Sequence, residues 1–300
     1  MIIALLSSEK IPDDKLHRLI SKKLDLINNV QICSNKKGDI LLYPTDFPNS
    51  IVSLLNILSV SDKVMLCVNG QITALDAELV LAVENSDLGG IVLKDEYSDI
   101  TSFDRFFKGY RITDFKKVGL SEEYSFENEY KTRNFKYVSI DKHFIVKGIG
   151  SVLIGFVLGD TVKKGEKLLL LPSLKACTIK SIQVMDVDRS EAEGGTHVGL
   201  ALNNVSEEDL SNNYAVSSFR ELEQVYNVSL HISPFYKEDI FSKQLSFSFF
   251  GENIPVSLTN ENGITRARFN KKIPSIKGRY PVADASLSIG KNRIAGSITL

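Results

Sequence analysis

The chain has 300 residues, of which 43% are hydrophobic and 24% are charged, a balance that is ordinary for a globular protein and excludes a disordered chain. This length allows two or three domains. No apolar run reaches the ~18 residues of a membrane-spanning helix, and the N-terminus lacks the pattern of a cleavable leader. We therefore expect a cytoplasmic protein without a membrane partner.

Charge is distributed unevenly, although the net charge is only −1. Residues 1–130 carry 14 basic and 20 acidic side chains, whereas residues 221–300 carry 10 and 7. A basic C-terminal part opposite an acidic N-terminal part favours a polyanionic partner on one side. The three cysteines and four histidines are too scattered for a disulfide framework or a metal site.

Residues 1–130 alternate between strand and helix patterns, which predicts a mostly parallel sheet with covering helices. Met1–Leu6 reads as a buried strand. The next pattern predicts a helix with Leu16, Leu19, Ile20, Leu24 and Ile27 on one face. Thr73 and Asp76 resemble a capping box. Residues 100–110 predict one more helix, with Phe103, Phe106, Phe107 and Tyr110 packing inward.

Short strands separated by turn residues begin at Tyr137 and predict a small closed barrel. Gly148 and Gly150 permit a bend between the first long strands, and Gly155 allows a bulge or a close backbone approach. Further strands follow up to about Ser218.

Period-two alternation returns after residue 220 and predicts a second barrel. Asn260-Glu-Asn-Gly supplies a hairpin turn. The strand after it places Ala267 and Phe269 on one face, and Arg266, Arg268 and Asn270 on the other.

Ordered motifs between residues 140 and 210 resemble the second domain of translation elongation factor Tu and, within that family, the selenocysteine-specific elongation factors. The motifs are Ile-Asp-x-x-Phe-x-x-x-Gly-x-Gly-x-Val-x-x-Gly (140–155), Val-x-x-Gly-Glu-x-Leu-x-x-x-Pro (162–172), Ile-Lys-Ser-Ile-Gln (179–183), Val-Gly-Leu-Ala-Leu (198–202) and Glu-Asp-Leu (208–210). The resemblance implies a GTPase-like α/β domain over residues 1–130, a domain 2-like β-barrel over 131–220 and a domain 3-like β-barrel over 221–300.

The GTPase-like domain departs from the family pattern at its phosphate loop. Ser7 and Pro12 stand at the positions of the two glycines, and Asp13 and Asp14 at those of the lysine and the hydroxyl residue. Two carboxylates at a helix N-terminus repel a phosphate. We interpret them as stabilising the first helical turn, and we expect neither GTP nor Mg²⁺ as a cofactor.

Two further motifs are altered in the same domain. The switch position reads Tyr43-Pro-Thr-Asp-Phe-Pro48, in which the prolines stiffen the loop. Asp46 there caps or forms a turn, or binds a cation. The base-reading position reads Leu93-Lys-Asp-Glu96 and lacks the family's asparagine. We interpret residues 1–130 as a degenerate G domain kept as a scaffold, with residues 121–133 as a linker.

Two groups of site residues follow. By resemblance, Asp141 and Phe144 stand where the family lines its aminoacyl pocket; the alternatives are a turn cap for Asp141 and barrel core for Phe144. The basic residues of the second barrel form an RNA-binding candidate, because several cations on one face bind phosphates. Its alternative is a solvated strand face. These residues are Arg266, Arg268, Lys271, Lys272, Lys277, Arg279 and Arg293.

No arrangement of a nucleophile, a histidine and an acid stands out, so we expect a non-enzymatic protein. The leading hypothesis is an elongation-factor-like translation protein that binds tRNA or the ribosome through its barrels. Two alternatives remain: a GTPase with an atypical site, and a protein-interaction scaffold that docks through the acidic first domain.

Overall fold

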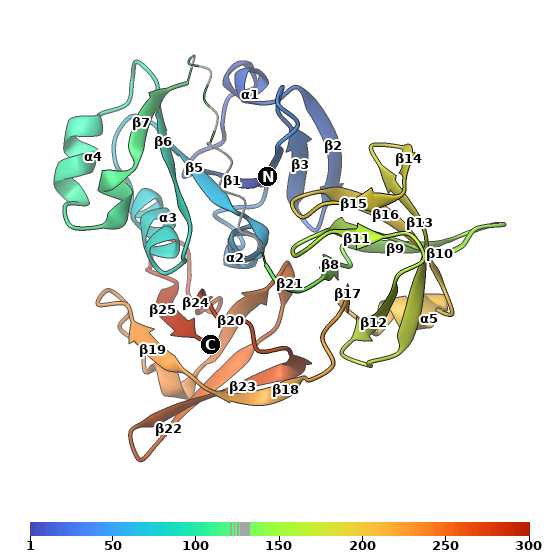
Figure 1. Ribbon diagram of the computed structural model, residues 1–300. Coiled ribbons are helices and arrows are strands. Elements are labelled where there is room, and N and C mark those ends of the chain that lie inside the picture. The colour runs from blue at the N-terminus through green and yellow to red at the C-terminus, as the bar shows by residue number, and fades with distance from the viewer. Residues whose placement is uncertain (121, 123, 125, 127–132) are drawn as a thin grey trace.

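The N-terminal part of the chain forms a seven-stranded sheet in the computed structural model, which describes residues 1–120, 122, 124, 126 and 133–300. The strand order is β2-β3-β4-β1-β5-β6-β7 (Figure 1). β4, β1, β5, β6 and β7 are parallel, whereas β2, β3 and β4 pair antiparallel, so the sheet is mixed. The strands are β1 Ile2–Ser7, β2 Lys22–Ile27, β3 Val30–Ser34, β4 Ile40–Pro44, β5 Lys63–Val68, β6 Gly89–Lys94 and β7 Lys116–Gly119.

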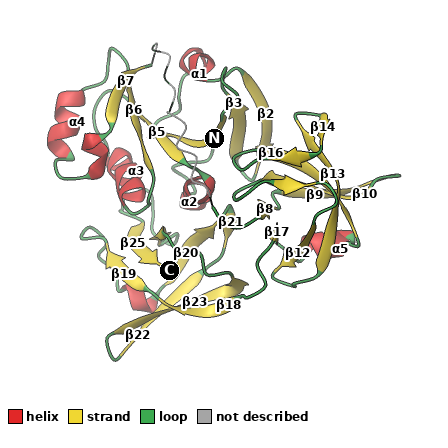
Figure 2. Ribbon diagram, viewed as in Figure 1, coloured by secondary structure: helices red, strands yellow, loops and turns green. Residues whose placement is uncertain are grey.

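Helices cover both faces of this sheet (Figure 2). One face, with Ala4 and Val64, packs in a core with α2 and α3, whereas the other, with Ile3 and Met65, packs with Leu16 of α1. Thr73 forms the predicted capping box with Asp76 at the start of α3. The helices are α1 Asp13–Leu19, α2 Ile51–Val60, α3 Ala74–Glu84 and α4 Ile100–Phe106, and a 3-10 turn η1 spans Arg111–Asp114.

The helix expected after Pro12 is correct only up to Leu19. Leu24 and Ile27 lie in β2, which forms a hairpin with β3. Asn28 and Asn29 turn this hairpin with φ angles of 50° and 61°, which asparagine adopts more readily than most residues. The local turn and the sheet edge therefore override a helical spacing of apolar residues.

The helix expected over residues 100–110 is also shorter, because α4 ends at Phe106. Phe103 and Phe107 are buried in the core as predicted. Phe106 is 67% exposed, so its expected inward packing is wrong. Phe106 and Phe107 are neighbours in the chain, and adjacent helical positions do not share a face.

The first barrel follows residue 136 and is closed by six strands, in the order β8-β17-β12-β13-β16-β10. Val138 and Val157 bridge antiparallel and complete the ring. Gly155 makes the predicted close approach, because a Cβ there would lie 1.8 Å from the Ser139 carbonyl oxygen. The elements are β8 Tyr137–Ser139, β9 Lys142–Val146, β10 Gly150–Phe156, β11 Val162–Lys163, β12 Lys167–Leu171, β13 Ala176–Val184, β14 Val187–Arg189, β15 Glu191–Ala192, β16 His197–Asn203, α5 Glu207–Ser211 and β17 Ala215–Ser217.

The C-terminal part is β-rich, with strand order β18-β23-β22-β20-β24-β25-β19. Ala267 and Phe269 are fully buried, and Arg266 and Arg268 are exposed, as the alternation predicted. Asn262 and Gly263 have positive φ angles in the predicted turn. The elements are β18 Glu223–Asn227, β19 Ser229–Ile232, η2 Ile240–Ser242, β20 Gln244–Phe249, β21 Glu252–Asn253, β22 Val256–Glu261, β23 Ile264–Ile273, β24 Arg279–Ala283 and β25 Ile294–Thr299.

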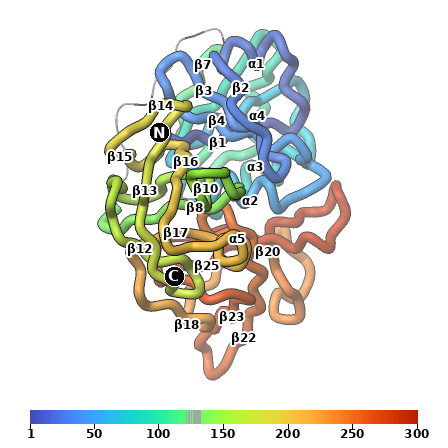
Figure 3. Tube along the Cα trace, turned by 90° about the vertical axis from the view of Figure 1, so that its right-hand side faces the viewer, coloured from blue at the N-terminus to red at the C-terminus, as the bar shows by residue number. Residues whose placement is uncertain are grey.

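The N-terminal part packs directly on this second barrel, and one hydrophobic core runs through both. α2 lies against β20, where the Ser248 hydroxyl donates to Asn56 Oδ1 at 2.8 Å and lies 3.0 Å from the Ser59 hydroxyl. The β22–β23 hairpin projects away from this junction, at the end of the molecule opposite α1 (Figure 3).

Candidate functional site

The carboxyl ends of the parallel strands form the edge at which open α/β sheets bind ligands. Here that edge is occupied by side-chain contacts. The Lys15 ammonium in α1 forms an ion pair with Asp95 after β6 and lies 5.7 Å from the ring centroid of Tyr97. Asn69 Nδ2, after β5, donates to the Ser7 hydroxyl at the end of β1 at 3.0 Å. The Lys15–Asp95 pair joins the helix after the predicted phosphate-loop position to the predicted base-reading position.

Asp95 is held as an anion by this arrangement. Partial burial opposes ionisation, but hydrogen bonds from the Lys15 ammonium, the Tyr97 backbone N–H and the Ser98 hydroxyl outweigh it and lower the pKa of Asp95. The Asp95 charge in turn raises the pKa of Lys15. The pair is therefore fully charged at neutral pH.

The loop between β1 and α1 carries no glycine, and acidic residues follow it at the start of the helix. Pro12 precedes the helix without a capping side chain, and Asp13 and Asp14 are exposed in its first turn. Ile11 is buried, with 3% of its surface exposed. This local structure agrees with the interpretation of Asp13 and Asp14 as first-turn residues, whose charge complements the helix dipole.

Asp46 in the switch position bonds to protein groups. Its Oδ1 accepts from the Ser53 hydroxyl at 2.5 Å, and its Oδ2 accepts from Asn29 Nδ2 at 3.1 Å. Asp46 thus connects the β2–β3 turn to α2, and its carbonyl oxygen accepts from the Asn49 backbone N–H at 2.7 Å in a local turn. Among the described residues, no group of three or more histidines, cysteines or acids is placed to hold a metal ion.

Asp141 lies at the junction of all three parts of the molecule. It lines a cavity of about 50 Å³ together with Ile27 of the β2–β3 hairpin, Asn56 of α2 and Gly251 of the second barrel. Its Oδ2 is buried and has no hydrogen-bond partner among the described residues. Burial raises the pKa of Asp141 to about 7, the charge of Glu252 adds to this, and the Ser139 hydroxyl opposes it. The cavity has room for a few water molecules.

Phe144 is not part of that cavity. It lies in β9, is 38% exposed, and pairs with Val152 across the β9–β10 hairpin. The structure therefore does not bring Asp141 and Phe144 together in this cavity, and their role in an aminoacyl pocket stays a prediction. Phe144 is also not barrel core.

Three of the predicted RNA-binding residues share the outer face of β23. Arg266, Arg268 and Lys272 alternate with buried residues and are exposed. Arg266 forms an ion pair with Glu261 at 2.8 Å, so its charge is partly compensated. Lys271 points the other way and forms an ion pair with Glu252 of β21.

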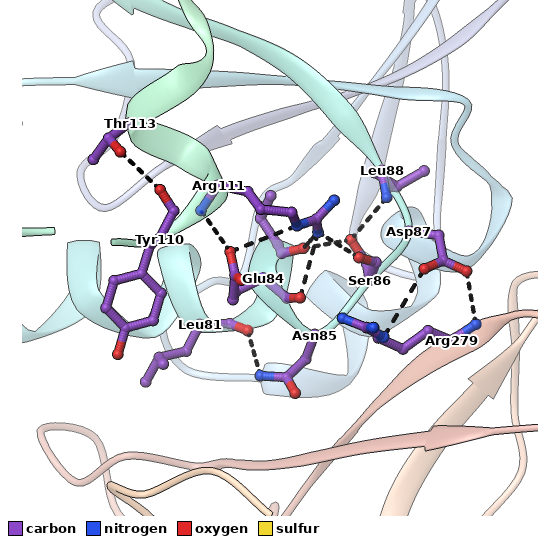
Figure 4. A network of polar contacts seen from close by, with 11 residues as sticks. Leu81, Glu84, Asn85, Ser86, Asp87, Leu88, Tyr110, Arg111, Thr113 and Arg279 are labelled. Carbon is purple, nitrogen blue, oxygen red and sulfur yellow. Dashed lines mark hydrogen bonds and ion pairs between the residues drawn. The ribbon is translucent and has the colours of Figure 1, made fainter. Parts of the chain in front are cut away.

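Two more of these cations lie at the border with the N-terminal part. Lys277 and Arg279 are exposed and line a cavity of about 560 Å³ with Asp87. The Arg279 backbone N–H donates to Asp87 Oδ2 at 2.9 Å, and its guanidinium lies 4.0 Å from Oδ1. Figure 4 shows this contact beside the network in which Arg111 binds the end of α3.

Arg293 is not available to RNA, which corrects its assignment to the basic surface. It is 2% exposed, and its Nε and NH2 atoms donate to the two carboxylate oxygens of Glu78 in α3, at 2.9 and 2.5 Å. Its NH1 donates to the Pro48 carbonyl oxygen at 2.8 Å. A buried guanidinium needs such a partner. Glu78 was missed, because its partner lies 215 residues away and no local pattern marks it.

No protein-family profile matches the chain. An uncharacterised protein of Methanocaldococcus jannaschii is 25% identical over 226 residues, which are 71% of this chain and 72% of that protein. The selenocysteine-specific elongation factor of the same organism is 39% identical over 71 residues, 24% of this chain and 15% of that factor. Elongation factor 1-alpha of Cenarchaeum symbiosum is 32% identical over 73 residues, 24% of this chain and 17% of that factor.

Solved structures of selenocysteine-specific factors match almost the whole chain. Translation elongation factor SelB of Methanococcus maripaludis with a GTP analogue superposes with a TM-score of 0.76 at 14% identity, over 99% of this chain and 78% of that one. A bacterial selenocysteine-specific elongation factor gives a TM-score of 0.72 at 15% identity, over 100% of this chain and 57% of that one. No helix among the described residues is long and apolar enough to cross a membrane. The chain thus has the fold of the selenocysteine-specific elongation factors, which confirms the resemblance of its motifs.

Proposed function

We propose that this chain is an elongation-factor-like translation protein that binds tRNA or the ribosome through its barrels, without hydrolysing or requiring GTP. The observation that carries this proposal is the Lys15–Asp95 ion pair at the edge where a nucleotide would lie. A phosphate loop leaves its backbone N–H groups and its lysine free for the phosphates. Here the nearby lysine is already bound to a carboxylate.

The junction between the N-terminal part and the second barrel supports the same proposal. The Glu78–Arg293 pair and the α2–β20 contact hold the two parts together without a nucleotide. Arg293 also binds Pro48 of the switch position. A switch loop tied to another domain in this way has no need of a γ-phosphate to order it. We infer that the domain is a degenerate G domain, used as a scaffold and free of Mg²⁺.

The exposed cations of β23 are the proposed RNA contact. Arg268 and Lys272 have no ion-pair partner among the described residues. Arg268 pairs with Ser257 in the β22–β23 hairpin, which projects from the molecule, and Lys272 follows the paired part of that hairpin. Arginine and lysine contacts to phosphates release counterions, so binding weakens as salt rises.

The proposal is tested by two titrations of one preparation. Filter binding with total tRNA at 50 and 200 mM salt is expected to show saturable binding that weakens with salt. Calorimetry with GTP and Mg²⁺ is expected to give no heat, and an elongation factor with an intact phosphate loop serves as the positive control. Saturable GTP binding at micromolar concentrations would favour the atypical GTPase. No binding in either titration, together with a co-purifying protein partner, would favour a protein-interaction scaffold.

A further inference from the structure

A cavity of about 340 Å³ lies between α3, the end of α4 and two loops of the second barrel, one after β19 and one before β25. In Figure 1 α3 lies next to β25, and α4 lies on the outer side of α3. Ala77 and Leu81 come from α3, Phe107 and Tyr110 from the segment between α4 and η1, and Phe235 and Lys291 from the loops. Figure 4 shows Leu81 and Tyr110 among the residues of the neighbouring polar network.

The walls of this cavity are apolar and aromatic, and part of them faces water. Phe106 and Phe235 also line it and are 67% and 52% exposed. Exposed apolar surface gathered at a hollow marks a binding site more often than isolated exposed residues do. The volume falls within the range of about 300–1,000 Å³ that is typical of small-molecule pockets.

The charges at the cavity favour an anion. Glu78 lines it, but both of its carboxylate oxygens bind the Arg293 guanidinium, so its negative charge is neutralised. The Lys291 side chain is exposed and has no ion-pair partner in the part of the chain that the structure describes. One unpaired positive charge therefore stands at the edge of an apolar hollow.

We propose that this cavity binds a small organic anion with an aromatic or branched apolar body and one acidic group. The apolar body lies against Leu81 and Phe107, and the acidic group pairs with Lys291. Because the walls come from two parts of the molecule, a bound ligand stabilises their junction. Binding therefore raises the midpoint of thermal unfolding, as any ligand selective for the folded state does.

The probe for this site is the aromatic sulfonate 8-anilinonaphthalene-1-sulfonate, titrated by its fluorescence into the full chain. We expect one saturable site and a higher unfolding midpoint with probe present. Ala77→Leu fills the cavity from α3 and is expected to weaken binding at least tenfold. Lys291→Gln removes the charge and is expected to weaken it two- to fivefold, the range of an exposed ion pair. Ala176→Leu, at an exposed position of the first barrel, is the matched control and is expected to leave binding unchanged.

Several outcomes would overturn the proposal. If the probe fluorescence does not saturate, or if Ala77→Leu leaves it unchanged, the probe binds outside this cavity. Absence of probe binding together with a change of oligomeric state in Ala77→Leu by sedimentation would make the hollow a protein interface instead. If Ala77→Leu fails to fold, Phe235→Ala, which removes an exposed loop side chain from the wall, gives the same test.

Discussion

Glu78 of α3 and Arg293 before β25 form a two-pronged ion pair in which each side chain is only 3% exposed. The pair joins the N-terminal sheet domain to the second barrel. The Arg293 backbone N–H also donates to Glu78 Oε1 at 3.0 Å, so one carboxylate satisfies three donors from the same residue. The geometry fixes the position of α3 on the barrel.

Breaking this pair from one side is expected to be costly. Glu78→Gln leaves a buried guanidinium without its counter-charge, and we expect the free energy of unfolding to fall by about 3–5 kcal/mol. The measurement is urea-induced unfolding at pH 7. Replacing both partners, Glu78→Leu with Arg293→Met, is expected to recover much of the loss.

A control for this comparison is Glu261→Gln, which removes the partner of the exposed Arg266. An exposed pair contributes about 0–1 kcal/mol, so little change is expected. Equal losses in Glu78→Gln and Glu261→Gln would contradict a structural role for the buried pair.

The Lys15–Asp95 pair predicts a pH dependence. The folded-state pKa of Asp95 lies below its unfolded value of about 3.9. The pair's contribution is therefore present above about pH 4 and is lost as the pH falls through the folded-state pKa. Lys15→Met is expected to lower stability by about 1 kcal/mol at pH 7. The difference between the urea midpoints of the two proteins should shrink as the pH falls below about 4, and a difference that stays constant from pH 7 to pH 3 would speak against the ion pair as its cause.

Gly155 provides a test of the first barrel. Gly155→Ala places a Cβ 1.8 Å from the Ser139 carbonyl oxygen, and we expect a loss of about 3 kcal/mol or more because backbone must move. Gly199→Ala on the neighbouring β16 is the matched control, since its nearest contact is the Gln183 Cβ at 4.0 Å. Thermal unfolding of both variants measures the difference; similar midpoints would refute the close approach.

Sequence predicted best where a local pattern and the tertiary environment agree. Gly155 marks a close contact, Thr73 and Asp76 mark a helix start, and Ala267 and Phe269 mark a buried face. Each of these three signals depends on residues that are close together in the sequence or on one strand. The Asn28–Asn29 pair is an equally local turn signal, but the helical spacing of the apolar residues around it predicted a helix instead.

The site was less predictable because its contacts are long-range. Lys15 and Asp95 are 80 residues apart, and Glu78 and Arg293 are 215 residues apart. A basic residue near the C-terminus looks like a surface cation until its partner is known. The strand pattern alone places Arg268 correctly on the outer face. That Arg293 is buried follows only from the packing of α3 on the barrel.

Asp141 predicts a second pH dependence, of opposite sign. Its folded-state pKa of about 7 lies above the unfolded value, so the buried carboxylate destabilises the fold as the pH rises from about 4 to 7. Asp141→Asn removes this penalty, and we expect it to raise the free energy of unfolding at pH 8 by on the order of 2 kcal/mol. The gain should vanish at pH 4. Urea unfolding across this range measures it, and a variant that is less stable at pH 8 would show that the charge is compensated.

The cations of β23 give the last prediction. If Arg268 contacts a phosphate, Arg268→Ala weakens tRNA binding and reduces the slope of log affinity against log salt by about 1. Arg266→Glu with Arg268→Glu is expected to abolish binding at 200 mM salt, because two of the three charges on the outer face are reversed.

Lys108→Ala is the control, since Lys108 is an exposed cation just after α4, far from the β22–β23 hairpin. Its salt slope should match that of the unmodified chain. A slope that falls equally in Lys108→Ala and Arg268→Ala would mean that RNA responds to overall charge and not to this strand. Arg293 gives the sharper contrast: an RNA-binding loss in Arg293→Met is expected only where unfolding accompanies it, because the guanidinium is buried against Glu78.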